Sequence, residues 1–197
     1  MLLDAPGFAP AALDFVAARP QLLGGFFRAA VRAEHLAMTS GSVLDILIYV
    51  FDRYMLDEAP EVPEREDLAQ DLRRAGFAAA RVERALDWLT DLACGQRHSA
   101  DALPAHRGLR LFTESESARL STDCRGLVLR LEDAGVLTPS QREIVIERML
   151  ALDADEPDTE QLKWVVLMVL SSQPGQEAAV ERLGGVVAAE AEGNVPH

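Results

Sequence analysis

The chain has 197 residues, of which 49% are hydrophobic and 26% charged, and its formal net charge at pH 7 is −13. This composition can bury the core of one large or two small domains, and it excludes a globally disordered chain. Residues 1–42 carry no net charge, so the acidic excess lies beyond them. A duplex binder needs Lys and Arg to offset phosphate charge, so nucleic acid is disfavoured as a partner. The acidity serves either solubility or attraction to a basic protein surface.

The two cysteines, Cys94 and Cys124, have no C-x-x-C spacing and no Cys/His cluster around them. We therefore expect no structural zinc, and two thiols in a reducing cytoplasm rather than a disulfide. The N-terminus does not resemble a secretory signal, because its first positive charge is Arg19. The most apolar run, WVVLMVL at 164–170, is far shorter than the roughly twenty residues of a membrane span. These features predict a cytoplasmic protein with no membrane contact, no metal and no cofactor.

The N-terminal part differs in character from the rest, because residues 1–41 are rich in Ala, Pro and Gly. We expect them to form an extension that is either disordered or the product of a start assigned too far upstream, with Met38 as the alternative start. Order is expected to begin with SVLDILIYVFDRYM. There Ser42 and Asp45 form a helix-start signature, with the carboxylate near the positive end of the helix dipole.

Two further helices are predicted after a Pro- and acid-rich connection. One spans 66–75 and ends at Gly76, and the other spans 78–93 with apolar residues at core spacing. Residues 94–108 are predicted to form a loop, whose histidines have no carboxylate or cysteine at ligand spacing. The run LRLF at 109–112 favours a strand, but it is too short to found a sheet.

The second half of the chain is predicted to be helical throughout. Its helices are expected to begin at four N-cap residues, Thr113, Ser121, Thr138 and Asp158. Three of these caps are followed three residues later by Glu or Gln, which is the capping-box pattern. The helix that begins at Asp158 carries the apolar run 164–170 and is predicted to be the buried centre of the fold. A weaker helix over 176–191 follows the break QPG.

A short internal similarity favours two helical modules built on one plan. The stretch LRRAGF…VERAL at 72–86 matches LEDAGV…IERML at 131–150 in its Leu, Ala-Gly and Glu-Arg positions. The predicted fold is all-α, with two small modules that contain helix-turn-helix-like units and at most one short β-strand. The predicted boundaries are 1–41 for the extension, 42–93 for the first module, 94–108 for the loop, 109–192 for the second module and 193–197 for a tail.

The helix-turn-helix-like units raise the alternative of DNA reading. A reading helix must offer Arg, Lys, Asn or Gln to base edges on its exposed face. In the 131–153 unit, the second helix carries two arginines against two glutamates, and the helix after Gly76 is net acidic. Nucleic-acid binding would therefore depend on a local positive patch around three arginines, Arg110, Arg125 and Arg130.

No catalytic motif stands out. The sequence lacks G-x-S-x-G, H-E-x-x-H, a P-loop and G-x-G-x-x-G. The acidic stretch LDADEPDTE at 152–160 lacks the central glycine and spaced terminal Glu of an EF-hand. Trp88 and Trp164 occupy apolar helical positions that are typical of a core. We predict no catalytic, cofactor-binding or metal-binding residue, and therefore a protein that is not an enzyme.

From about residue 43 to the C-terminus, the sequence resembles the Smg family, small bacterial proteins also described as a domain of unknown function. The segments that carry the resemblance are LDILIYVFDRYM, DLRRAGF…VERALDWL, LRLFTESESARL, CRGLVLRLEDAGVLT, REIVIERMLALD and LKWVVLMVLSSQPG. The family has no assigned activity, so the resemblance implies no site residue. Its members are often encoded beside DNA-processing proteins of the type that load recombinase, which implies a partner of that class.

The leading functional prediction is a non-enzymatic protein-interaction module, an adaptor or regulator in DNA processing or recombination whose acidic surface meets a basic protein patch. The alternative is a nucleic-acid-binding helix-turn-helix protein that uses the three arginines. An enzyme is the third option, and it requires an enclosed pocket with converging polar groups.

Overall fold

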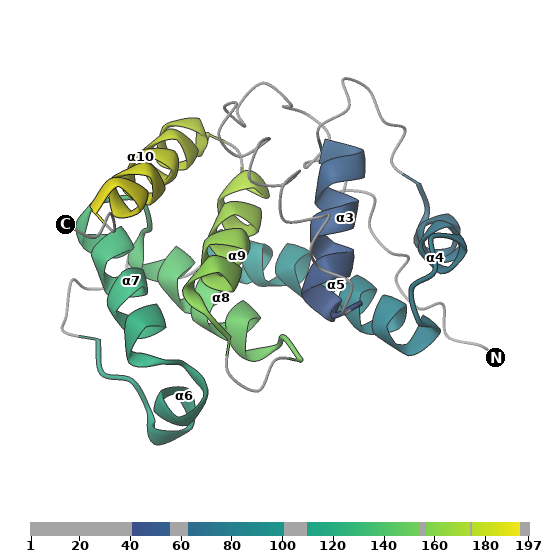
Figure 1. The fold of residues 1–197 in the computed structure, drawn as a ribbon, viewed down its shortest axis with the longest axis horizontal. Helices are drawn as coiled ribbons and strands as arrows, with labels where there is room; N and C mark the ends of the chain where they lie inside the picture. Colours follow the sequence, from purple (N-terminus) through teal and green to yellow (C-terminus); the bar gives the residue numbers. More distant parts are fainter. Residues whose placement is uncertain (1–40, 56–62, 101–109, 154–156, 174, 194–197) are drawn as a thin grey trace.

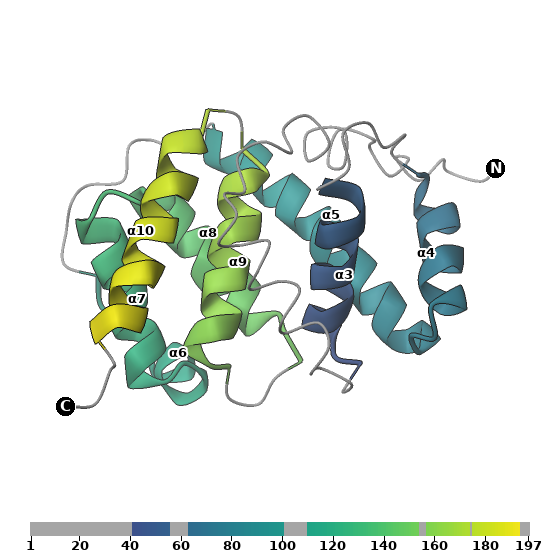
Figure 2. The same ribbon diagram turned by 45° about the horizontal axis from the view of Figure 1, so that its top comes forward.

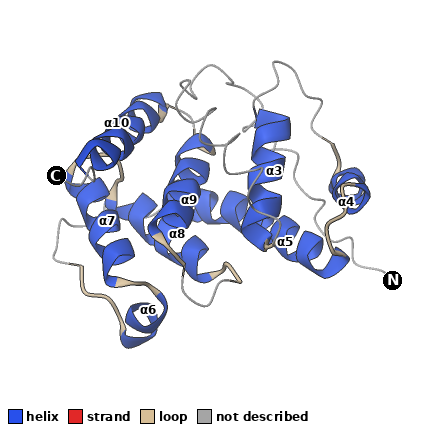
Figure 3. Cartoon of the chain, in the orientation of Figure 1, coloured by secondary structure: helices blue, strands red, loops and turns tan. Residues whose placement is uncertain are grey.

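The computed structural model describes residues 41–55, 63–100, 110–153, 157–173 and 175–193. Within these ranges the chain forms eight α-helices and no β-strand (Figures 1 and 3), so the predicted all-α fold is confirmed. The helices are α3 (Val43–Met55), α4 (Arg65–Arg74), α5 (Ala79–Ala100), α6 (Glu114–Arg119), α7 (Thr122–Asp133), α8 (Pro139–Leu150), α9 (Thr159–Ser171) and α10 (Glu177–Gly193). The predicted extension and tail lie almost wholly outside the described residues.

Local caps begin and end the helices where the sequence predicts. Three reciprocal capping boxes begin α6, α8 and α9, and their N-cap residues are Thr113, Thr138 and Asp158. In each box the cap side chain accepts from the third helical N–H, and the third side chain accepts from the cap N–H. Gly76 and Gly135, which follow α4 and α7, have φ angles of 101° and 68°, a conformation that favours glycine.

Two predicted segments are wrong in detail. The predicted loop 94–108 begins too early, because α5 continues to Ala100. Gly95 in a helix interior costs only about 1 kcal/mol, which is too little to end a long helix, and the first proline comes at Pro104. The predicted strand at 109–112 is not formed by its described residues, which have no regular secondary structure.

The helices are arranged along the molecule in three groups. In Figure 1, α3 and α4 lie at one end, α6, α7 and α10 lie at the other, and α8 and α9 lie between them; Figure 2 shows the same order. α5 packs against α3, α4 and α8, and α9 packs against α3, α7, α8 and α10. The division into modules at 42–93 and 109–192 stays a prediction, although both stretches contribute to one core cluster.

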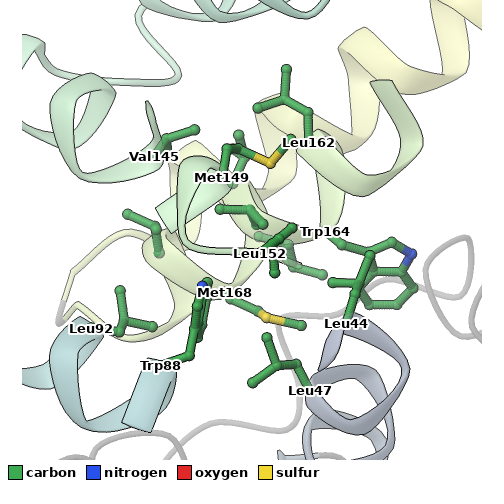
Figure 4. Packing of buried hydrophobic residues seen from close by; sticks show 14 of the residues in the cluster. Leu44, Leu47, Trp88, Leu92, Val145, Met149, Leu152, Leu162, Trp164 and Met168 are labelled. Carbon is green, nitrogen blue, oxygen red and sulfur yellow. The ribbon is translucent and has the colours of Figure 1, made fainter. Parts of the chain in front are cut away.

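The centre of that core is formed by side chains from α3, α5, α8 and α9 (Figure 4). Residues 164–170 of α9 are all buried, which confirms the prediction for this helix. Trp88 and Trp164 are core residues, as predicted. Neither cysteine forms a disulfide within the described residues; Cys94 is exposed and Cys124 is buried. None of the helices in the described ranges is long and apolar enough to cross a membrane.

Candidate functional site

α8 is the second helix of the predicted 131–153 unit, and it is buried on most of its circumference against α5, α7 and α9. Between residues 141 and 150 its exposed side chains are Glu143 and Glu147, one turn apart. Arg142 and Arg148, the neighbours of these glutamates in the sequence, are both buried. The helix therefore turns carboxylates toward solvent and guanidinium groups toward the protein.

An alternating ion-pair network holds the first of these arginines. Arg142 pairs with Glu132 of α7 at 2.6 Å and with Glu143 at 2.7 Å. Glu143 also accepts from Arg110 Nη2 at 2.9 Å, and Arg110 makes two hydrogen bonds of 2.6 and 2.7 Å to the carboxylate of Glu116. Planar, bidentate pairs of this kind are strong and directional. The network joins the segment before α6 to three helices.

The charges of this network are fixed near neutral pH. Hydrogen bonds from Arg110 lower the pKa of Glu116 to about 2. Burial would raise the pKa of Glu143, but hydrogen bonds from Arg110 and Arg142 outweigh burial and lower it. Because both pKa shifts favour the ionised form, Glu116 and Glu143 are carboxylates near neutral pH.

A second contact, between Trp88 and Arg148, joins α5 to α8. Trp88 Nε1 donates to the carbonyl oxygen of Arg148 at 2.9 Å, and Arg148 Nη1 donates to the carbonyl oxygen of Trp88 at 3.4 Å. The Arg148 guanidinium lies 5.9 Å from the centre of the Trp88 ring. It also pairs with Asp91 at 3.3 Å and with Glu147 at 2.8 Å. The indole thus packs against a cation whose partners face solvent.

Three of these carboxylates form a surface that we call the acidic ridge: Asp91, Glu143 and Glu147. Their side chains are 63%, 49% and 68% exposed, whereas those of the three arginines that pair with them are at most 11% exposed. Together with Glu116 and Glu132, five carboxylates meet three guanidinium groups, so these eight side chains carry a net charge of −2.

One end of the ridge adjoins the irregular segment before α6. Arg110 Nη1 donates to the carbonyl oxygen of Leu111 at 2.7 Å, and the same guanidinium binds Glu143. The Leu111 side chain is 77% exposed. Its neighbour Phe112 packs against the core, with the Arg110 guanidinium 4.7 Å from the ring centre. Arg110 and Phe112 therefore anchor the segment while Leu111 extends into solvent.

The structure brings together two of the three arginines predicted for nucleic-acid binding. Arg125 lies 5.8 Å from the Phe112 ring that Arg110 also contacts, and it donates to the hydroxyl groups of Ser117 and Thr122. Arg130 lies farther along α7, where it is exposed. The charge of Arg110 is balanced by two glutamates. At this site the charge of Arg110 is therefore neutralised by carboxylates, and Arg125 is hydrogen-bonded to hydroxyl groups.

Sequence reasoning missed the acidic ridge, because it counted the two arginines of α8 against its two glutamates without assigning them to different faces of the helix. A signal was present in the helical spacing. Arg142 and Arg148 lie three residues on either side of Val145, which is fully buried, so periodicity places both arginines beside the core face. No group of three or more metal-ligating side chains capable of holding an ion is present in the described part of the chain.

The comparisons with known proteins agree with the resemblance seen in the sequence. The family model described as "Protein of unknown function (DUF494)" matches residues 43–195. A Protein Smg homolog from Nitrosococcus oceani is 47% identical over 139 residues, which are 70% of this chain and 87% of the relative. One from Methylococcus capsulatus is 41% identical over 146 residues, 74% of this chain and 92% of the relative.

A third relative, the Protein Smg homolog of Stenotrophomonas maltophilia strain K279a, is 44% identical over 138 residues, or 70% of this chain and 87% of the relative. No solved structure matches. The family match covers all of the described helices, including both arginines that lie behind the ridge on α8. The chain belongs to the Smg family, whose function is unknown.

Proposed function

We propose that this protein is a non-enzymatic interaction module, and that the acidic ridge binds a basic surface on a protein partner. The observation that carries the proposal is the arrangement of charged side chains on α8, where the glutamates are exposed and the arginines that pair with them are buried. A basic surface that approaches the ridge contacts its exposed carboxylates before the buried arginines. The net negative charge of these paired groups attracts that surface over several ångströms.

The buried arginines also favour binding by holding the carboxylates in place. A free surface glutamate loses side-chain entropy when it forms an ion pair, which largely cancels the gain. Glu143 and Glu147 are already oriented by Arg142 and Arg148, at 2.7 and 2.8 Å. The remaining cost of ordering them on contact with a partner is therefore small.

We assign the partner to DNA processing or recombination. The gene neighbourhood that accompanies the resemblance to the Smg family supports this assignment. The proposed role is that of an adaptor or regulator, which the exposed and fixed carboxylates of the acidic ridge support.

The test is co-purification of the full chain with proteins from nuclease-treated native lysate, at low and at high salt. Glu143→Gln with Glu147→Gln removes two charges of the ridge. Glu66→Gln with Glu181→Gln removes two exposed charges from α4 and α10 and serves as the matched control. We expect a specific protein to be recovered by the wild type and the control, and to be lost in the ridge variant and in high salt. Failure to recover any protein, or equal loss in both variants, would contradict the proposal.

The second candidate is nucleic-acid binding, favoured by the meeting of Arg110 and Arg125 at Phe112. It is tested by fluorescence anisotropy with a random-sequence duplex and a single strand at low salt. We expect no saturable binding by the wild type, because phosphate groups would meet the carboxylates of Glu116 and Glu143 beside Arg110. Saturable binding that Arg125→Gln abolishes would favour this candidate over the first.

A further inference from the structure

We propose that Leu111 is the apolar anchor of the interface, and that the partner offers an apolar pocket bordered by Lys or Arg side chains. This inference rests on the proposed function, because it specifies the chemistry of the surface that the acidic ridge meets. An interface of this kind combines a buried apolar centre, which supplies affinity, with charged residues at its rim.

The first argument is exposure. Leu111 and Leu129 are the exposed large hydrophobic residues of the described part of the chain, 77% and 38% exposed. A single exposed leucine is common on protein surfaces, so exposure alone does not assign a role. Leu111 differs from an ordinary surface leucine because its backbone carbonyl oxygen is hydrogen-bonded and because a charged network adjoins it.

The second argument is the rigid presentation of the leucine. The carbonyl oxygen of Leu111 accepts a 2.7 Å hydrogen bond from Arg110, whose own guanidinium is fixed by Glu116 and Glu143. Two residues farther on, Thr113 begins α6 with a reciprocal capping box. Because both sides of Leu111 are fixed, a partner loses little free energy in ordering this segment.

The third argument is the charge beside the leucine. One guanidinium, that of Arg110, binds both the Leu111 carbonyl oxygen and the Glu143 carboxylate. The Arg110 side chain is 11% exposed and that of Glu143 is 49% exposed, so the more exposed charge of this ion pair is the carboxylate. Charge complementarity therefore selects a pocket with a basic rim. A second copy of the chain would bring carboxylate against carboxylate, so we assign the surface to a different protein.

The experiment uses the full chain in the bacterium that encodes it, with photoreactive p-benzoylphenylalanine in place of Leu111. The matched control carries the same amino acid in place of Leu129, the other exposed leucine. We expect irradiation to give a covalent adduct with one protein from position 111 and not from position 129. The cross-linked peptide should contain apolar residues flanked by Lys or Arg.

Binding of the purified partner then measures the contribution of the leucine. Leu111→Ser should weaken the affinity at least about tenfold, as expected for a central apolar contact, and Leu129→Ser should change it less than about twofold. Equal effects of the two substitutions, an adduct with a second copy of the chain, or an adduct with nucleic acid would each overturn the inference.

The same experiments separate this inference from the proposed function. If the wild type recovers a partner that the ridge variant loses, while position 111 gives no adduct and Leu111→Ser binds normally, the anchor is wrong and the proposed function stands. If the wild type recovers no protein, both are overturned.

Discussion

Arg110 illustrates at the scale of single residues how one guanidinium organises several elements. It binds Glu116 of α6, Glu143 of α8 and the carbonyl oxygen of Leu111. Glu116→Gln should lower the free energy of unfolding by about 1.5 kcal/mol, because the ion pair with Arg110 is lost and the Gln amide can accept only one of the two hydrogen bonds that Arg110 donates. Gln is also accepted at the third position of a capping box, so the start of α6 should be kept. Urea unfolding at pH 7 measures the loss, and Glu114→Gln, an exposed change in the same turn, is the control.

The effect of Glu116→Gln should also depend on pH. The pKa of Glu116 is lowered from an ordinary value of 4.5 to about 2 in the folded protein. A carboxyl group whose folded pKa is depressed stabilises the fold above its unfolded pKa, and this contribution is lost as pH falls through the folded pKa. The difference between wild type and variant should therefore be constant from pH 7 to about 5 and shrink toward pH 2. A difference that stays constant down to pH 3 would contradict the role given to Arg110.

At the scale of helices, α8 depends on a cap that the sequence alone predicts. Thr138 accepts from Gln141 N at 3.2 Å, and Gln141 Oε1 accepts from Thr138 N at 2.8 Å. Thr138→Ala should cost about 1 kcal/mol in the free energy of unfolding, because it leaves a helix N–H without its acceptor. Thr138→Ser keeps the hydroxyl and should cost much less, as measured by urea unfolding followed by circular dichroism. Equal losses in both variants would assign the effect to the lost methyl group instead of the cap.

Helix caps could be predicted from the sequence, whereas contacts between distant segments, such as those of Glu143 on α8, could not. Caps are local, so Thr113, Thr138 and Asp158 could be found within windows of four residues. The partners of Arg110 could not all be found in this way, because Glu143 lies 33 positions away. The nucleic-acid alternative requires Arg110 to belong to a local positive patch, and in the structure this arginine pairs with two carboxylates. The end of α5 was also mispredicted, because the helix continues through Gly95 to Ala100.

At the scale of the whole molecule, the core joins the two predicted modules in two places. The side chains of Trp88 on α5 and Arg148 on α8 each donate a hydrogen bond to the backbone carbonyl oxygen of the other residue. Phe51 of α3 packs edge-on against Trp164 of α9, with ring centres 6.3 Å apart. Because both contacts are buried within one core cluster, we expect the described helices to unfold as one cooperative unit.

Single-tryptophan variants test this cooperativity. Trp164→Phe leaves Trp88 as the fluorescent reporter of the α5–α8 contact, and Trp88→Phe leaves Trp164 as the reporter of the α3–α9 contact. Within each variant, the urea transition of the remaining tryptophan should coincide with the loss of helical circular dichroism, because neither module can separate without exposing shared core. The comparison is made inside one variant, so the stability lost by each substitution cancels. Two separated transitions would instead show that the stretches 42–93 and 109–192 fold independently. The acidic ridge would then span a boundary between mobile parts, because Asp91 belongs to the first stretch and Glu147 to the second.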